Sequence, residues 1–265
     1  MAETIEQRVT PYGHLAYGEQ LKKKHEWLRG VLGALGNSLE KEIKRGNEIA
    51  PHWYRQSKEM PLSDDIIHSD ALEGYRNKVE FTVGYQYAPP RDGENELWSK
   101  GPVCVGFNRG NLAKGISFVE KPDSIKVNSA ESLIVAKKFE KIVAESGLTP
   151  YDKSVNRGFW RILVYRESKV TKQVLICVVV SKQTEDNKDV RPLTQGLKDT
   201  LISEFRDGTP VGDRGYKICS LSVIYATDLS GGYKEGDEWE VLSGTGHYEE
   251  VLCGFRFTVS PFAFF

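Results

Sequence analysis

The sequence predicts an α+β protein, in which an N-terminal helical segment precedes a ferredoxin-like (βαββαβ) mixed α/β domain with additional antiparallel strands. Apolar residues recur every three or four positions near the N-terminus, as in an amphipathic helix, and every second position in several short segments after residue 74. Two further helical segments stand between these strand-like segments, an order typical of α+β folds. We therefore expect helices and a linker in residues 1–73 and an α+β domain in residues 74–259.

The first predicted element is helical and runs from His14 to about Arg45, because its leucines lie mostly three, four or seven positions apart while charged residues fill the opposite face. Glycines inside the segment weaken the pattern, since each costs up to about 1 kcal/mol relative to alanine. One long helix and two helices broken near Gly36 are both compatible with it. From Arg45 to Glu73, prolines and acidic pairs without periodicity predict a long surface connection.

The strand pattern begins at Lys78–Tyr85, where apolar residues alternate with polar ones and predict a half-buried strand. The segment Ala88–Ser99 holds two adjacent prolines and an Asp-Gly pair, which predict a loop. Short strands are expected to follow at 102–108 and 116–120.

A helix is predicted after Asn128, which we expect to be its N-cap because Glu131 follows three residues later, and Gly147 is expected to end it. Trp160–Glu167 then alternates as a strand. Gln173–Ser181 is a continuous apolar run, which suits a central strand covered on both faces.

A second helix is predicted from Pro192, because Leu193 and three later apolar residues repeat every fourth position. The strand Lys217–Thr227 is expected next, with an inner face formed by Cys219, Leu221, Val223 and Tyr225. The order of elements from Ile116 matches the split βαβ arrangement, in which two helices cover one face of an antiparallel sheet. The other face is then available for a ligand.

The last part of the chain is predicted to be turn-rich from Asp228 to His247 and to end in two strands, Tyr248–Leu252 and Phe255–Val259. Gly244-Thr245-Gly246 lies in this turn-rich stretch without a helix after it, so we interpret it as a turn and not as a phosphate-binding loop.

Charge and hydropathy exclude several classes of function. Lys and Arg total 36 against 37 Asp and Glu, a formal net charge of −1, which argues against nonspecific coating of nucleic acid and against a polybasic membrane anchor. A nucleic-acid contact would therefore need a local basic stripe. No segment has the roughly 18 apolar residues of a membrane span, and the first residues are too polar for a secretory signal. We expect a soluble, intracellular protein, cytoplasmic or nuclear, with a mitochondrial location left open.

Groups for catalysis or metal binding do not cluster in the sequence. No spacing among the five histidines or the four cysteines makes a metal pair, and no serine occupies a nucleophile elbow. We interpret Cys104, Cys177 and Cys219 as reduced core residues of apolar strands. Cys253 is also predicted to be a buried structural thiol, because nothing basic stands next to it.

The sequence feature that favours RNA binding is a set of basic residues that alternate with aromatic residues on predicted strands. Unpaired RNA bases stack on aromatic and guanidinium planes while the charges meet phosphate oxygens. The alternative is a solvated sheet face whose long basic side chains cover apolar surface and in which Lys78 pairs with Glu80. The candidate RNA-binding residues are Arg76, Asn77, Lys78, Arg109, Arg161 and Arg166.

Several motifs together resemble the eukaryotic branch of the tRNA uracil-5-methyltransferases. YRNKVEF and SPFAFF are the specific ones, and the matches run in order from about residue 10 to the last residue. They are Thr10-Pro11, Tyr17–Leu32, YRNKVEF (Tyr75–Phe81), VGFNRG (Val105–Gly110), Thr149–Asp152, GFWRILVYR (Gly158–Arg166) and SPFAFF (Ser260–Phe265).

The resemblance implies an enzyme that makes 5-methyluridine in the tRNA T loop from S-adenosylmethionine. In that family a cysteine thiolate adds to C6 of uracil, so that C5 can attack the donor methyl group. The resemblance also implies that residues 260–265 begin a Rossmann-like domain, which carries the methyl-donor loop, the nucleophile and the acid/base group. None of these groups maps onto the chain, so we expect a fragment that is inactive alone, with no catalytic, cofactor-binding or metal-binding residue.

Under this resemblance the chain supplies recognition of the T arm, whose target uridine must be splayed out of the loop. Arg76 and Lys78 are the leading phosphate or base-edge contacts, Arg161 and Arg166 rank second, and Arg109 third. Two alternatives stay open: a stand-alone RNA-binding or tRNA-chaperone module without catalysis, and a protein-interaction domain.

Overall fold

The computed structural model describes residues 4–46, 66–88, 98–110, 117–182, 193–230 and 232–263. It divides into two compact units, Met1–Ala71 and Leu72–Phe265. Each unit is described by itself.

The first unit contains α1 (Ile5–Val9) and α2 (Tyr17–Lys44). The sequence pattern did not reveal α1, which begins with a reciprocal capping box between Thr4 and Gln7. Of the two alternatives for the predicted helix, the structure has the single long one, which continues through Gly30, Gly33 and Gly36 without a break. Neither these helices nor the others in the described residues are long and apolar enough to cross a membrane.

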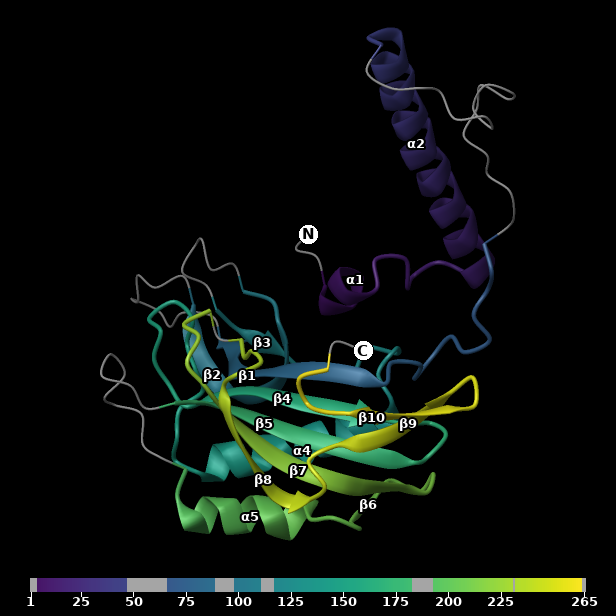
Figure 1. Cartoon of the computed structure of the whole chain (residues 1–265). Coiled ribbons are helices and arrows are strands. Elements are labelled where there is room, and N and C mark those ends of the chain that lie inside the picture. Colours follow the sequence, from purple (N-terminus) through teal and green to yellow (C-terminus); the bar gives the residue numbers. More distant parts are fainter. Residues whose placement is uncertain are drawn as a thin grey trace. The chain divides into compact units, whose positions relative to one another are not determined.

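The second unit is built on an eight-stranded sheet with strand order β3-β2-β1-β4-β5-β7-β6, in which β8 also pairs with β7. Strands β9 and β10 form a separate two-stranded sheet (Figure 1). The strands are β1 (Lys78–Ala88), β2 (Ser99–Asn108), β3 (Val119–Glu120), β4 (Trp160–Glu167), β5 (Gln173–Ser181), β6 (Pro210–Val211), β7 (Tyr216–Ala226), β8 (Glu238–Gly244), β9 (Tyr248–Leu252) and β10 (Phe255–Val259).

The bounds predicted for β4, β5, β9 and β10 are confirmed. Strand β1 continues to Ala88, which pairs with Ser99, so both ends of the predicted loop are strand residues, and 89–97 lie outside the described residues. Strands β6 and β8 were not predicted. Strand β8 falls within the supposed turn-rich stretch, where neighbouring glycines and its half-exposed residues hide the alternation.

The ferredoxin-like order of strands is not confirmed. In a ferredoxin-like sheet the first strand, which precedes the first helix, would lie next to the last strand, which follows the second helix. Among the described strands, β3 pairs with β2, and β5 with β7 is the parallel pair. The difference arises because β1 lies between β2 and β4 and separates the supposed unit.

The helices of this unit are α4 (Ala130–Glu145) and α5 (Gln195–Phe205). The predicted cap at Asn128 is wrong by one residue: Ser129 is the N-cap, with extended backbone and an Oγ that accepts from the Ser132 amide at 3.2 Å. Thr194 caps α5, so this helix starts later than predicted, and Pro192 lies outside the described residues.

Both helices pack on one face of the sheet, where the main core contains Phe81, Phe139 and Trp160. A second apolar cluster on the opposite face joins β4, β5 and β7 to Tyr248 and Val259 of the C-terminal hairpin. Figure 1 shows the helices and the hairpin on opposite sides of the sheet. The expectation that the second face is free for a ligand is therefore wrong over these strands, while the double covering predicted for β5 is confirmed.

The predicted inner face of β7 needs one correction, at Cys219. The β5–β7 register shifts between Val174/Ile218 and Leu175/Ser220, which leaves Cys219 in a bulge. As a result Ile218 packs with the helices, and Cys219 packs with the hairpin cluster on the other face.

Candidate nucleic-acid interface

The segment Arg76–Lys78 is fixed from both sides at the start of β1. The Arg76 amide donates to the Val127 carbonyl at 3.0 Å, and the Asn77 carbonyl accepts from the Glu167 amide at 2.9 Å. Lys78 then pairs with Arg166 in the antiparallel β1–β4 ladder. The backbone of this segment therefore has a defined place between the approach to α4 and the end of β4.

The side chains of this segment face solvent to different degrees. Arg76 and Lys78 are half-buried and Asn77 is exposed. The Lys78 ammonium lies 3.0 Å from a Glu80 carboxylate oxygen, so the ion pair expected on this face is present. Within the described residues, the Arg76 guanidinium makes no ion pair and is available to an outside anion.

A buried carboxyl group lies behind this segment. Tyr165 and Ser129 donate to the same oxygen of Glu167 at 2.6 and 2.8 Å. The other oxygen is buried with no partner among the described residues. Burial therefore raises the pKa of Glu167 despite the two hydrogen bonds, and burial beside this carboxyl raises the pKa of Tyr165.

Arg161 lies inside the protein, where the sequence predicted an RNA contact. Its Nε donates to the Ser181 hydroxyl at 2.9 Å, and Nη1 donates to the carbonyl oxygen of Asp228. The guanidinium also stacks over the Tyr151 ring, with Cζ 4.1 Å from the ring centroid. These contacts join β4 to the loop after β7.

Arg166 is fully buried and has a similar joining role. Its Nη2 donates to the Ala263 carbonyl and lies 3.4 Å from the Pro261 carbonyl. The Tyr233 hydroxyl donates to Glu80 at 2.9 Å and lies 3.5 Å from the Pro261 carbonyl. Arg166 and Tyr233 together hold residues 261–263 against β1 and β4.

Arg109 directly follows β2 and forms an ion pair with Glu120 of β3. Its amide donates to the Phe118 carbonyl at 3.0 Å. The antiparallel register, with Gly106 opposite Thr82, brings this end of β2 toward the start of β1. Arg109 is thus half-exposed at the same end of the sheet as Arg76–Lys78.

The structure therefore brings Arg76, Asn77, Lys78 and Arg109 to one end of the sheet with at least part of each side chain exposed. Arg166 is at this end but buried, and Arg161 is buried farther along β4. Sequence reasoning missed the positioning roles of Glu167 and Tyr233. The acidic end of the apolar strand β4 was a signal for Glu167, whereas Tyr233 lay in a stretch interpreted only as turns.

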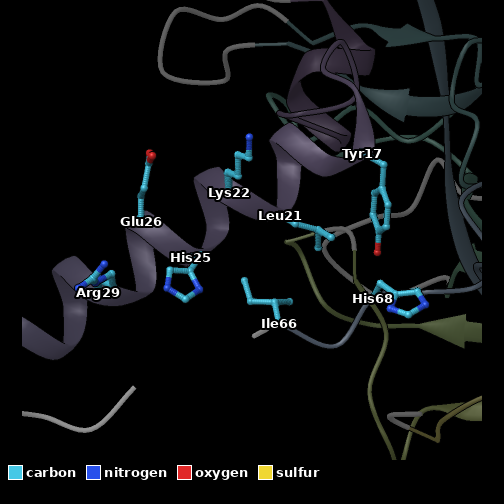
Figure 2. Close-up of a pocket in the computed structure, with 8 residues that line it drawn as sticks. All are labelled: Tyr17, Leu21, Lys22, His25, Glu26, Arg29, Ile66 and His68. Atoms are coloured by element: carbon cyan, nitrogen blue, oxygen red, sulfur yellow. The ribbon is translucent and has the colours of Figure 1, made fainter. Parts of the chain in front are cut away.

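The first unit has a hollow of its own, with a cavity volume of about 770 Å³, between α2 and residues 66–68. Figure 2 shows Tyr17, Leu21 and His25 turned toward Ile66 and His68, while Lys22 and Glu26 point away. The Tyr17 hydroxyl accepts from the Ser69 amide at 2.7 Å, which holds the ring in place.

The four cysteines are free thiols in different environments. Burial raises the pKa of the Cys104, Cys177 and Cys219 thiols to about 12, so they are protonated at neutral pH. The prediction of a buried Cys253 is wrong, because this residue is exposed in the turn between β9 and β10, with φ of 52°. The described residues contain no group of three or more His, Cys, Asp or Glu able to hold a metal ion.

Among the described strands, β5 and β7 form a parallel pair joined through α5, the arrangement that holds a nucleoside in Rossmann-like folds. Its strand-to-helix connection, QTEDNKDVRP (183–192), contains no glycine for a backbone loop that approaches a nucleoside closely. None of the described thiols is paired with a base beside such a loop.

Comparison with known proteins finds relatives that are named tRNA (uracil-5-)-methyltransferase homologs. No family model matches the chain. It is 30% identical to zinc finger CCCH domain-containing protein 24 of Arabidopsis thaliana, over 97% of the chain and 34% of that protein. It is 27% identical to tRNA (uracil-5-)-methyltransferase homolog A of Mus musculus, over 97% of the chain and 39% of that protein. Homolog B of Danio rerio is 26% identical, over 99% of the chain and 49% of that protein.

Proteins named tRNA (uracil-5-)-methyltransferase homologs thus align with almost the whole chain, which supports the predicted family. The chain spans between 34% and 49% of the length of these three relatives. A solved structure, the tRNA (uracil-54, C5)-methyltransferase of Pyrococcus abyssi in complex with S-adenosyl-L-homocysteine, is similar at a TM-score of 0.45 and 16% identity. That similarity covers 74% of this chain and 38% of the solved one.

Proposed function

We propose that this chain is the substrate-recognition part of an S-adenosylmethionine-dependent tRNA uracil-C5 methyltransferase, which makes 5-methyluridine in the T loop. The observation that carries the proposal is the alignment of the named methyltransferase homologs along 97–99% of the chain. In this proposal the donor site, the nucleophilic thiol and the acid/base group belong to residues outside these 265. S-adenosylmethionine would supply the methyl group there.

The proposed RNA contacts are the exposed or half-exposed members of the predicted set. Arg76 and Lys78 bind T-arm phosphates, Asn77 binds a phosphate or a base edge, and Arg109 extends the basic surface along the same end of the sheet. Guanidinium and ammonium groups at a sheet end suit a bent RNA loop, because charge holds the backbone while unpaired bases remain free to turn outward.

Arg161 and Arg166 receive a different role in the proposal. Their guanidinium groups donate to the protein's own carbonyls in buried positions, and moving them to a phosphate would leave those carbonyls without donors. We assign them to positioning the surface.

Binding of a T-arm RNA hairpin, measured by fluorescence anisotropy at several salt concentrations, tests the recognition part of the proposal. The chain is expected to bind this hairpin more tightly than a scrambled hairpin. Arg76→Ala is expected to weaken binding and to reduce the slope of log K against log salt by roughly one, because one phosphate contact is lost. Arg206→Ala removes an exposed cation next to α5 and serves as the control. Equal affinity for the two hairpins would refute T-arm recognition.

A second experiment tests the assignment of catalysis to other residues. The 265-residue chain is incubated with the T-arm hairpin and S-adenosylmethionine carrying a radiolabelled methyl group. We expect no label in the RNA and no retention of the donor in equilibrium dialysis. Turnover by this chain would overturn that assignment. An intracellular location, cytoplasmic or nuclear, is part of the proposal and is tested by imaging a fluorescent fusion.

A further inference from the structure

The tip of the β9–β10 hairpin exposes large apolar side chains. Phe255 is 69% exposed, Phe257 48% and Leu252 63%. Single exposed apolar residues are ordinary, but adjacent exposed rings on one ribbon are typical of a binding surface. We call Phe255 and Phe257 the hairpin platform, and Leu252 is an exposed aliphatic neighbour without a ring.

The hairpin platform occupies one face of the ribbon. The register pairs Phe255 with Leu252, Phe257 with Glu250 and Val259 with Tyr248. Alternate residues share a face, so both rings are on the face that buries Val259 and Tyr248 farther along. This face is therefore covered by the main sheet at one end of the ribbon and uncovered at the other.

The spacing of the two rings suits nucleobases. Residues two positions apart on a strand are separated by about 6.8 Å, and stacked bases along one strand repeat at about 3.4 Å. Each phenyl ring can therefore receive a base. A flat aromatic ring on a strand is the usual platform for an unpaired base, and this kind of stacking accepts any base.

The ribbon is hydrogen-bonded to the turn between β4 and β5 and to the first residue of β5. The Ser168 hydroxyl donates to the Glu250 carboxylate at 2.8 Å, and the Thr171 hydroxyl donates to the Glu249 carbonyl at 2.7 Å. The Glu249 amide donates to the Gln173 side chain at 2.7 Å. A platform fixed in advance loses little freedom when a ligand binds.

The surroundings of the platform favour a polyanion. Lys169 and Lys172 are exposed in the β4–β5 turn that holds the ribbon, and neither forms an ion pair within the part of the chain that the structure describes. The Lys172 ammonium lies over the Tyr216 ring, 4.4 Å from its centroid. Arg256, between the two phenylalanines, points to the other face and pairs with Glu249 at 2.5 Å.

Hydrogen bonds also connect the ribbon with the segment that carries the proposed RNA contacts. Asn77 bonds to Glu167, the next residue Ser168 bonds to Glu250, and Glu250 is opposite Phe257. Figure 1 shows the hairpin reaching the end of the sheet at which β4 ends. These contacts link the basic segment Arg76–Lys78 to the ribbon that carries the exposed rings.

We propose that Phe255 and Phe257 form a stacking surface for unpaired bases of the tRNA, adjoining the phosphate contacts of Arg76 and Lys78. This inference rests on the proposed function and adds two binding residues to it. The basic segment then holds the backbone of the RNA loop, and the rings hold bases that have left the stack.

The test compares the double variant Phe255→Ala/Phe257→Ala with the double variant Phe255→Tyr/Phe257→Tyr and with the matched control Leu252→Ala. Affinity is measured for the T-arm hairpin and for a fully paired RNA duplex. We expect the alanine variant to bind the hairpin about tenfold more weakly with an unchanged salt slope, because stacking releases no counterions. The tyrosine variant and Leu252→Ala are expected to bind like the parent chain, and duplex binding to be the same in all variants.

The outcomes separate this inference from the proposed function. If the parent chain binds the T-arm hairpin specifically and the alanine variant binds it equally well, the stacking surface is refuted and the proposed function stands. If the parent chain shows no preference for the hairpin, the proposed function fails first. If Leu252→Ala weakens binding of the T-arm RNA as much as the double alanine variant does, the surface makes a general apolar contact and stacking is refuted. If the double alanine variant abolishes self-association and leaves RNA binding unchanged, the platform is a contact between copies of the chain. Because the rings are exposed, an unchanged urea midpoint is expected and checks that the variants fold.

Discussion

Strands β1 and β4 are neighbours in one sheet and carry the same kind of sequence, basic residues next to aromatic ones, yet their cations are in opposite environments. At the start of β1, Arg76 and Lys78 are accessible to solvent. On β4, Arg161 and Arg166 are buried and donate to backbone carbonyls. A basic-aromatic pattern on a strand therefore indicates a nucleic-acid contact only where no other segment covers that strand.

The largest expected effect is that of Arg166→Ala on stability. The substitution removes the Arg166 donor from the carbonyl of Pro261, which is buried, and from that of Ala263, which is half-buried, and we expect the free energy of unfolding to fall by about 3 kcal/mol. Urea denaturation followed by circular dichroism measures it. Lys169→Ala, three residues along and exposed, is the control and should change stability by less than about 0.5 kcal/mol. A loss for Arg166→Ala as small as that of the control would remove the distinction between the two strands.

A smaller loss is expected for Arg161→Lys. Lysine keeps the charge but loses the planar contact with Tyr151 and the Nε bond to Ser181, so we expect a loss of about 1–2 kcal/mol. Affinity for the T-arm hairpin should stay within about twofold when the variant is measured far below its unfolding midpoint, which corresponds to less than about 0.5 kcal/mol. Weaker RNA binding with unchanged stability would return Arg161 to the set of RNA contacts.

The pH dependence of stability tests the burial of Glu167, the last residue of β4. Burial raises the pKa of Glu167 in the folded state above its unfolded value. The contribution of Glu167 to the free energy of unfolding is therefore fully present below the pKa of the unfolded state. It is lost as pH rises through the pKa of the folded state. Glu167→Gln keeps acceptors for Tyr165 and Ser129, so the variant should gain stability relative to the parent as pH rises from 4 to 8. Glu145→Gln, at the exposed end of α4, is the control. Parallel curves for Glu167→Gln and the parent chain would show that Glu167 is not buried as a carboxylate.

The smallest expected change in stability is that of Arg76→Ala. The guanidinium makes no ion pair among the described residues, so the free energy of unfolding should stay within about 0.5 kcal/mol of the parent value. The same variant should nevertheless lose affinity for RNA, the reverse of the result expected for Arg166→Ala. A marked loss of stability would show that Arg76 belongs with the buried arginines.

The elements that could be predicted from the sequence are those whose signal is local. The alternation of Trp160–Glu167 and the apolar run Gln173–Ser181 depend on side chains within a few residues, and both strands have the predicted bounds. The order of strands could not be predicted in the same way. It depends on β1 pairing with β4, a contact between segments about 80 residues apart that no local pattern encodes.

In the candidate site, too, contacts between residues near in sequence could be predicted and long-range contacts could not. The ion pair of Lys78 with Glu80, two residues apart, was predicted and is present. The partners of Arg161 and Arg166 are 67 and 97 residues away in the chain, so the sequence around β4 does not reveal their burial. The exposed rings of β10 were missed for the opposite reason, because an alternating segment predicts one buried face and only the tertiary structure shows where the covering sheet ends.

The double covering of β5 has a consequence for motion. Backbone amides in a strand that is buried on both faces exchange with solvent only when the whole unit unfolds. Deuterium should therefore enter β5 last, while β4, which carries the contacts to Asn77 and the turn to the hairpin, is hydrogen-bonded directly to it. The proposed recognition surface is in this way anchored one strand from the slowest-opening part of the molecule, so its shape should persist between encounters with RNA.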